Sequence, residues 1–194
     1  IKLSEKANEL SREFSINQKL SEAIVRESDV VFGGVSGFVI TSSNNIMAPN
    51  AGIDKSNSQG KLILYPNDPY LIAEQIKRKF FLDYSLHVGI IIVDSRLMPA
   101  RIGTSGVAIA CSGIEPVSDR RATKDLDGNV LKVTFQAVAD NLASIANHKM
   151  GEADELLPIA IIRKSGAKLT DRKISSEETA IPYDECVYVR GLKR

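Results

Sequence analysis

The sequence predicts a mixed α/β fold of the α+β kind, rather than a doubly wound parallel sheet. Amphipathic helix patterns and short β-branched runs both occur along its 194 residues, but they do not alternate with clean βαβ periodicity. Hydrophobic residues make up 43% of the chain and charged residues 25%, which is ordinary for a globular protein. A chain of this length can bury one good core or two small ones.

The N-terminal part is predicted to contain two helices and a hairpin. Residues 4–14 carry apolar side chains at helical spacing, and a second helix over 17–27 begins at Asn17, a typical N-cap residue. Two short apolar runs, 29–32 and 37–41, flank a Gly-Gly-Val-Ser link and therefore predict a β-hairpin.

The middle of the chain begins with a short predicted strand over 61–65. Asp68 followed by Pro69 is a strong helix start, because aspartate caps the first turn and proline suits its first position, and the helix should end near residue 82. The continuous β-branched run 88–93 is typical of a strand buried on both faces.

Small residues and glycines dominate 103–113, where backbones are expected to approach closely. A helix is predicted over 137–148, and the polar segment 165–179 is expected to be a loose loop. Three further strands are predicted from apolar or β-branched runs: 130–135, 158–163 and 186–190.

Composition disfavours several classes of function. The net charge of +1 offers no electrostatic case for nucleic acid or for an anionic membrane. Two cysteines without a CxxC motif and two histidines argue against a zinc site or a disulfide framework. They fit a reducing compartment, and the expected location is the cytoplasm. No phosphate-binding P-loop or G-x-G-x-x-G motif is present, and neither His87 nor His148 has a nucleophile arranged around it.

The most informative segment is Asn50–Asn57, which places amides, a glycine, a carboxylate and a hydroxyl within eight residues. Asp54 and Asn57 lie three residues apart and could meet on one side of a turn. A carboxylate there suits a hard cation, and an amide suits a phosphate or a base edge. A solvated turn that caps the next element is the alternative.

Asp94 is the second candidate, because it follows a predicted buried strand and has the hydroxyl of Ser95 beside it. A carboxylate next to a hydroxyl is how magnesium is held in some nucleotide enzymes, although the same pair can also cap a turn. Glu152 lies at a predicted helix end, where the helix dipole opposes a negative charge. It is therefore a candidate cation ligand, with a solvated acidic turn as the alternative.

A group of basic residues could bind phosphate or carboxylate groups, although each residue alone is a weak signal. The group lies in one part of the chain and comprises Arg96, Arg101, Arg120, Arg121 and Lys124.

Taken in order, four segments resemble the coenzyme F420-0:L-glutamate ligases, the γ-glutamyl ligases of deazaflavin cofactor synthesis. The segments are NAGIDKSN (50–57), VDS (93–95) followed by Pro99-x-Arg101-x-Gly103, GVAIACSGIEPVSDRRATKDLDGNVLKVT (106–134) and AVADNLASIANHKMGEADE (137–155). The resemblance extends over most of the chain.

This resemblance implies an enzyme that uses GTP and Mn²⁺ or Mg²⁺, with K⁺ as a further candidate cation. It would join L-glutamate to F420-0 through an acyl phosphate, and then add a second glutamate by a γ-linkage. It also implies an archaeal-type cytoplasmic protein that forms an intertwined homodimer of two-lobed subunits. Residues 1–194 would be one ligase-like unit, with lobe boundaries that the sequence does not resolve.

The resemblance also assigns roles to individual positions. Asp54 and Asp94 match two ligands of one metal, whereas Ser95 and Glu152 fall where a second metal is held. Asn57 matches a nucleotide contact. The segment lying along the nucleotide would comprise Met150, Gly151, Glu152, Ala153, Asp154, Glu155, Leu156 and Leu157.

The chain departs from the family pattern at several positions. The usual glycine of a D-x-R-G motif is Ala122, an acidic position is Asn141, and the usual glycine after a later strand is Lys164. Family chains start with roughly fifty more residues, about a lobe segment, which carry lysine contacts to GTP. A non-catalytic module that binds metal, nucleotide or deazaflavin is therefore one alternative, and a ligase with a different acceptor is another.

Overall fold

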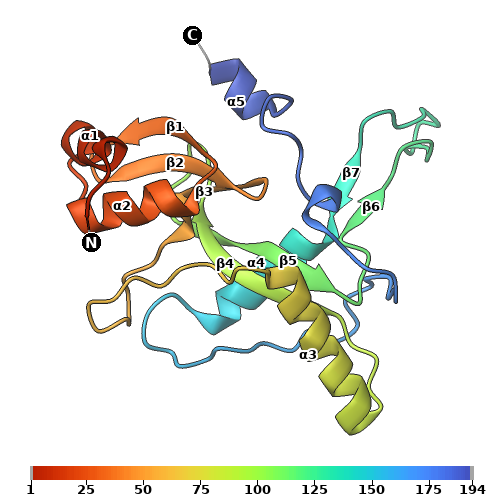
Figure 1. Cartoon of the computed structure of the whole chain (residues 1–194). Coiled ribbons are helices and arrows are strands. Elements are labelled where there is room, and N and C mark those ends of the chain that lie inside the picture. The colour runs from red at the N-terminus through yellow and green to blue at the C-terminus, as the bar shows by residue number, and fades with distance from the viewer. Residues whose placement is uncertain (1, 193–194) are drawn as a thin grey trace. The chain divides into compact units, whose positions relative to one another are not determined.

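The computed structural model describes residues 2–192, which form helices and small antiparallel sheets in two compact units (Figure 1). The first unit comprises the residues up to Asn67 together with those from Ala180 onward, and the second runs from Asp68 to Thr179. The predicted mixed α/β class is confirmed. The intertwined arrangement and the homodimer stay predictions.

The first unit packs two helices on a three-stranded sheet of order β1-β2-β3, in which neighbouring strands are antiparallel. Its elements are α1 (Glu5–Phe14), α2 (Gln18–Glu27), β1 (Val30–Val35), β2 (Phe38–Ser43), β3 (Ile46–Pro49), the 3₁₀ turn η1 (Asn50–Gly52) and α5 (Val187–Leu192). Both predicted N-terminal helices and the hairpin are therefore confirmed.

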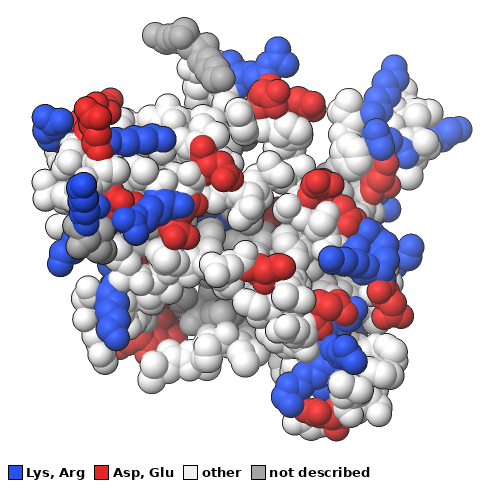
Figure 2. All heavy atoms as spheres, in the orientation of Figure 1, with Lys and Arg blue, Asp and Glu red and all other residues white. Residues whose placement is uncertain are grey.

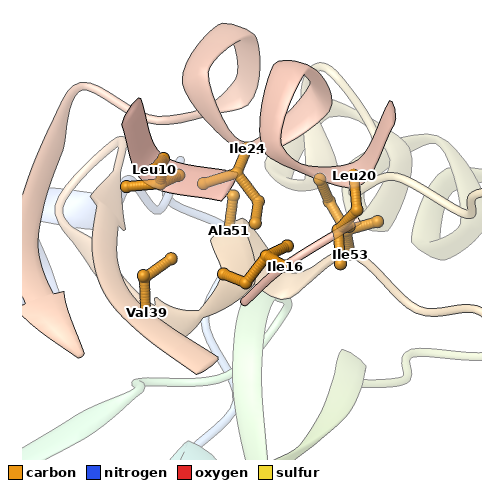
Figure 3. Close-up of a cluster of buried hydrophobic side chains, with 7 residues drawn as sticks. All are labelled: Leu10, Ile16, Leu20, Ile24, Val39, Ala51 and Ile53. Carbon is orange, nitrogen blue, oxygen red and sulfur yellow. The ribbon is translucent and has the colours of Figure 1, made fainter. Parts of the chain in front are cut away.

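The core of this unit explains why the two helices form where they do. Ser4 caps α1 by accepting a hydrogen bond from the Ala7 amide, and the Asn17 side chain caps α2. The apolar faces of both helices meet side chains from β2, from the turn η1 and from Ile53 directly after it (Figure 3). The buried cluster comprises Leu10, Ile16, Leu20, Ile24, Val39, Ala51 and Ile53.

Glu22 ties the two helices together. Its carboxylate accepts hydrogen bonds from the Ser4 amide and hydroxyl, each at 2.8 Å, and from Arg26 Nε at 2.8 Å. The bond from the Ser4 amide, followed by those from Arg26 and the Ser4 hydroxyl, lowers the pKa of Glu22 to about 2. Folding of α1 onto α2 is therefore coupled to an ionised carboxylate.

The second unit contains a long helix, a long hairpin and a second helix that packs on it. Its elements are α3 (Pro69–Tyr84), β4 (Ile90–Leu97), β5 (Thr104–Ser112), β6 (Val117–Asp119), β7 (Phe135–Ala137), α4 (Val138–Met150) and the 3₁₀ turn η2 (Ser176–Glu178). β4 pairs with β5 and β6 with β7, each antiparallel. Asp68 caps α3 by accepting from the Leu71 amide at 2.8 Å, as its sequence predicts.

Several predicted strands are wrong. Residues 158–163 form no strand, and Ile159 and Ile161 are 80% and 78% exposed. Of the predicted strand 186–190, residues 187–190 belong instead to α5, because a short apolar run does not distinguish strand from helix. Residues 61–65 and 130–135 each make only an isolated bridge, apart from Phe135, which opens β7.

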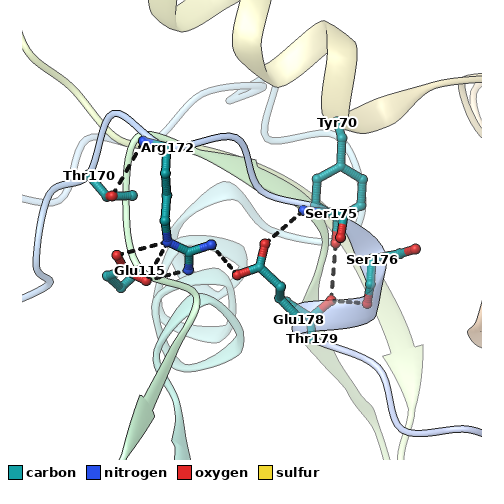
Figure 4. Close-up of polar contacts among 8 residues, drawn as sticks. All are labelled: Tyr70, Glu115, Thr170, Arg172, Ser175, Ser176, Glu178 and Thr179. Carbon is teal, nitrogen blue, oxygen red and sulfur yellow. Dashed lines mark hydrogen bonds and ion pairs between the residues drawn. The ribbon is translucent and has the colours of Figure 1, made fainter.

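Two other expectations need correction. The strand β4 is half-buried along its length rather than buried on both faces, because its partner is a single antiparallel strand. The segment 165–179 is not loose: Ile174 is buried, and Arg172 bonds both Glu115 and Glu178 (Figure 4). The hydroxyls of Tyr70 and Thr179 lie 3.0 Å apart, which ties the same segment to α3.

No helix within residues 2–192 combines the length and the apolar character needed to cross a membrane. Acidic and basic side chains are interspersed on the face seen in Figure 2, in keeping with the net charge of +1.

Candidate functional site

A polar cluster of the second unit surrounds Glu152. Its Oε1 accepts a hydrogen bond from Asn147 Nδ2 at 2.7 Å and another from Thr104 Oγ1 at 2.9 Å. Ser95 also donates to this carboxylate. The three donors come from α4, the start of β5 and the end of β4, so three separate elements converge on one carboxylate.

Close packing of α4 against β5 creates this convergence. A β-carbon at Gly106 would lie 2.5 Å from the Ala143 carbonyl oxygen and 2.5 Å from the Asn147 β-carbon, so only glycine permits the observed approach. Two further contacts hold this strand–helix seam between β5 and α4. The hydroxyls of Ser105 and Ser144 lie 3.0 Å apart, and the Ala108 amide donates to Asp140 at 3.0 Å.

The electrostatics of the cluster keep Glu152 ionised. Partial burial pushes its pKa upward, but the hydrogen bonds from Asn147, Ser95 and Thr104 outweigh that effect, and the pKa is lowered overall. The carboxylate nevertheless stays exposed to solvent. An ionised, oriented and accessible carboxylate beside a hydroxyl is suited to bind a hard cation.

Asp94 precedes Ser95 on β4, where it is paired in register with Val107. Successive strand residues direct their side chains to opposite faces, so Asp94 and Ser95 leave β4 in different directions. Asp94 lies 3.8 Å from Arg96, whose side chain is only 12% exposed. The Arg96 side chain is therefore largely buried beside Asp94, and little of it reaches solvent.

Met150 ends α4, and residues 152–157 of the loop that follows are exposed. Gly151 ends the helix with a φ of +82°, and a β-carbon there would lie 2.1 Å from the carboxyl carbon of Glu155. The Glu155 carboxylate thus folds back over the glycine and accepts from the Ala153 amide at 2.8 Å. Leu156 follows with a left-handed backbone and a 91% exposed side chain.

The predicted Asn50–Asn57 loop divides into two halves with different environments. Its first half is part of the core, because Ala51 and Ile53 are buried. The Asn50 side chain accepts from the Val39 amide at 3.0 Å, and Thr41 Oγ1 accepts from the Ala51 amide at 2.9 Å. These bonds anchor the loop to β2.

The second half of the loop is exposed, and its carboxylate is held locally. Asp54 Oδ1 accepts from the Lys55 amide at 2.6 Å and from the Ser56 amide at 2.8 Å, while Oδ2 accepts from the Ser56 hydroxyl at 2.5 Å. Burial opposes ionisation, but these bonds prevail and lower the pKa of Asp54. Asn57 follows with a φ of +50°.

The remaining predicted arginines occupy exposed positions. Arg121 forms a two-pronged pair with Asp119, at 2.7 Å for Nη2–Oδ2, and its guanidinium carbon lies 4.4 Å above the Phe135 ring. Arg120, which precedes Arg121, and Arg101, in the turn between β4 and β5, are also exposed.

Of the predicted metal ligands, the structure brings Ser95 and Glu152 together within the second unit. Asp54 belongs to the first unit, and each unit is described by itself. Within residues 2–192, no three His, Cys, Asp or Glu side chains are grouped as a metal ion would require. The metal assignments stay proposals.

Sequence reasoning missed Thr104 and Asn147. Thr104 lies in a segment that was noted only for its small residues. Asn147 lies five residues before Glu152, and the intervening Gly151 was the signal that the chain turns back on the helix end.

The departures from the family's glycines fall at left-handed backbone positions. Ala122 has a φ of +66° and Lys164 a φ of +56°, a region that glycine adopts without steric cost. The structure thus keeps the backbone that a glycine would favour while carrying a side chain there.

Comparison with known proteins identifies the class. The family model for F420-0:gamma-glutamyl ligase matches residues 1–164, and the chain belongs to this family. It is 36% identical over 186 residues to the coenzyme F420:L-glutamate ligase of Methanocaldococcus jannaschii, covering 95% of this chain and 74% of that protein.

Two further relatives carry the same name. The Methanopyrus kandleri protein is 37% identical over 81% of this chain and 63% of its own length. The Archaeoglobus fulgidus protein is 34% identical over 98% of this chain and 76% of its own length. The chain therefore spans about two thirds to three quarters of the length of these relatives.

Proposed function

We propose that this protein ligates L-glutamate to coenzyme F420-0 with GTP and a divalent metal, and then adds a second glutamate by a γ-linkage. Family membership and the names of the relatives supply the reaction class. The observation within the chain that supports it most is the ionised Glu152 carboxylate, oriented by three side chains beside the Ser95 hydroxyl.

The proposed chemistry proceeds in two steps. A carboxylate oxygen of the acceptor attacks the γ-phosphorus of GTP, which forms an acyl phosphate and releases GDP. The amine of L-glutamate then attacks the acyl carbon, the C–O bond to phosphate breaks, and the amine loses a proton. The protein contributes mainly by positioning the reactants and by stabilising charge.

The candidate ligands fit Mg²⁺ or Mn²⁺, because all are carboxylate or hydroxyl oxygens. In this proposal Asp54 and Asp94 hold one ion, and Ser95 and Glu152 hold another. Bound divalent ions supply positive charge that neutralises the phosphate oxygens. A role for K⁺ is part of the same proposal.

The nucleotide is proposed to lie along residues 150–157, from the last residue of α4 into the loop after it, and to contact Asn57. We also propose that the active form is a homodimer in the cytoplasm.

Incubation with F420-0, GTP, Mn²⁺ and L-glutamate tests the proposal. Mass spectrometry should detect F420 species extended by one and then two glutamates, with one GDP formed for each bond. Unextended F420-0 with intact GTP would contradict the proposal. Glutamate-dependent GDP formation with another carboxylate in place of F420-0 would instead identify a ligase with a different acceptor.

A further inference from the structure

The hydrogen bonds around Glu152 reveal two residues to which no role has been assigned. Thr104 and Asn147 both donate to the same oxygen, Oε1. We infer that these two are positioning residues, which orient Glu152 to bind a divalent cation. The inference rests on the proposed function, in which Glu152 holds one of the metal ions.

Two donors from separate elements fix the position of one carboxylate oxygen, Oε1. The terminal torsion of a glutamate is broad, so a lone carboxylate samples many orientations. Rotation of the Glu152 carboxylate would break its bonds to Thr104 and Asn147 together. The second oxygen, Oε2, is therefore held in a defined direction.

The donors themselves are rigidly placed. Thr104 is β-branched and opens β5, so its side chain has few accessible rotamers. Asn147 lies in the last turn of α4, and its β-carbon is packed over Gly106. The orientation of Glu152 is thus set by the strand–helix seam and not by the exposed loop that carries it.

The charge arrangement also distinguishes this cluster from an ordinary helix end. The carbonyl groups at the C-terminus of α4 disfavour a carboxylate nearby. Three side-chain donors offset that effect at a carboxylate that solvent reaches. A carboxylate maintained in this way can attract a cation, whereas a simple helix stop would need only Gly151.

A titration of Mn²⁺ tests the inference without relying on turnover. Free Mn²⁺ is measured by electron paramagnetic resonance in the presence of the protein and a non-hydrolysable GTP analogue. Loss of a hydrogen-bond partner of a metal ligand typically weakens binding by about 10- to 100-fold. We expect Thr104→Val and Asn147→Ala each to weaken one Mn²⁺ site by about 10-fold. Thr104→Ser keeps the hydroxyl donor and should bind Mn²⁺ as the wild-type protein does.

Ser144→Ala is the matched control. It removes a hydrogen bond of the same strand–helix seam, between Ser105 and Ser144, without touching Glu152. We expect wild-type Mn²⁺ affinity in this variant. If Thr104→Val and Asn147→Ala bind Mn²⁺ as Ser144→Ala does, at equal thermal stability, the two residues are structural and the inference is wrong.

Glu152→Ala separates this inference from the proposed function. If it leaves Mn²⁺ binding unchanged, Glu152 is not a metal ligand and the inference is overturned. The formation of glutamylated F420, measured on the wild-type protein, decides the ligase function independently of that result. A weakened site in Glu152→Ala together with wild-type binding in both positioning variants would also overturn the inference.

Discussion

Asp54 and Glu152 are both held by three hydrogen bonds, but the donors differ in their distance along the chain. Asp54 takes all three from Lys55 and Ser56, the two residues that follow it. Glu152 takes its bonds from Ser95, Thr104 and Asn147, on three elements of the second unit. The first carboxylate is ordered by a local turn, whereas the second depends on tertiary packing.

Two proposed ligands of the same chemical type therefore need not depend equally on tertiary packing for their orientation. A turn such as that of Asp54 forms wherever the local sequence allows it. The environment of Glu152 exists only while α4 lies close to β5. Disturbance of the seam should therefore affect Glu152 first, while removal of either carboxylate should affect catalysis directly.

The largest effect should follow removal of the proposed ligands of the first metal. We expect Asp54→Ala and Asp94→Ala to abolish glutamate ligation, because one remaining carboxylate would hold too weakly the metal ion that neutralises the phosphate charge. The free energy of unfolding should fall by no more than about 1 kcal/mol, since both side chains are at least partly exposed. Product formation by mass spectrometry and urea unfolding measure the two quantities.

Asp184→Ala, which removes another exposed carboxylate of the first unit, is the control and should keep its activity. If Asp54→Ala or Asp94→Ala retains the wild-type rate, the assignment of that residue as a metal ligand is wrong.

The next effect concerns the seam that positions Glu152. Gly106→Ala should reduce the stability of the second unit by about 1–3 kcal/mol, because the new β-carbon would overlap backbone atoms of α4. The shift of α4 should also weaken Mn²⁺ binding. Thermal unfolding and Mn²⁺ titration check both expectations.

Gly191→Ala in α5 provides the contrast, since a β-carbon there has open space. It should leave stability unchanged or raise it by up to about 1 kcal/mol through improved helix propensity. Equal stability of the Gly106 and Gly191 variants would show that the seam tolerates a larger separation than the structure has.

A third change addresses the anchor of the Asn50–Asn57 loop. Thr41→Val retains the shape of the buried side chain but removes the hydroxyl that accepts from the Ala51 amide and donates to the Ala48 carbonyl. We expect a loss of about 1–3 kcal/mol, because buried backbone groups lose their partner. Urea unfolding should detect this loss, and the local turn of Asp54 should survive it.

The exposed Thr123 provides the control, because its hydroxyl bonds the Arg120 carbonyl in a place that water can reach. Thr123→Val should cost less than about 0.5 kcal/mol. A Thr41→Val variant as stable as Thr123→Val would mean that the loop does not depend on its anchor to β2.

The smallest effect tests backbone strain that is set locally. Ala122→Gly and Lys164→Gly should each raise the free energy of unfolding by about 0.5–1 kcal/mol, because both residues have positive φ. Chemical unfolding measures the gain. Ala160→Gly, at a residue without positive φ, should instead lower stability slightly, and a similar loss at Ala122 would refute the strain argument.

Local signals in the sequence predicted the elements that depend on local physics. Ser4, Asn17 and Asp68 start their helices as expected, since a capping bond involves residues only two or three positions apart. The apolar runs 158–163 and 186–190 were misassigned because nothing in a short run shows whether another element pairs with it. The same limitation hid the burial of Ala51 and Ile53 within a polar loop.

The sequence by itself determined the family, the mixed α/β class, the helix starts and the acidic candidates Asp54, Asp94 and Glu152, because motif order, caps and composition are properties of neighbouring residues. Only the tertiary structure decided that Thr104 and Asn147 meet Glu152, and that Gly106 lets them do so. These contacts depend on how closely a helix approaches a strand, which arises from packing between segments about 40 residues apart in the chain.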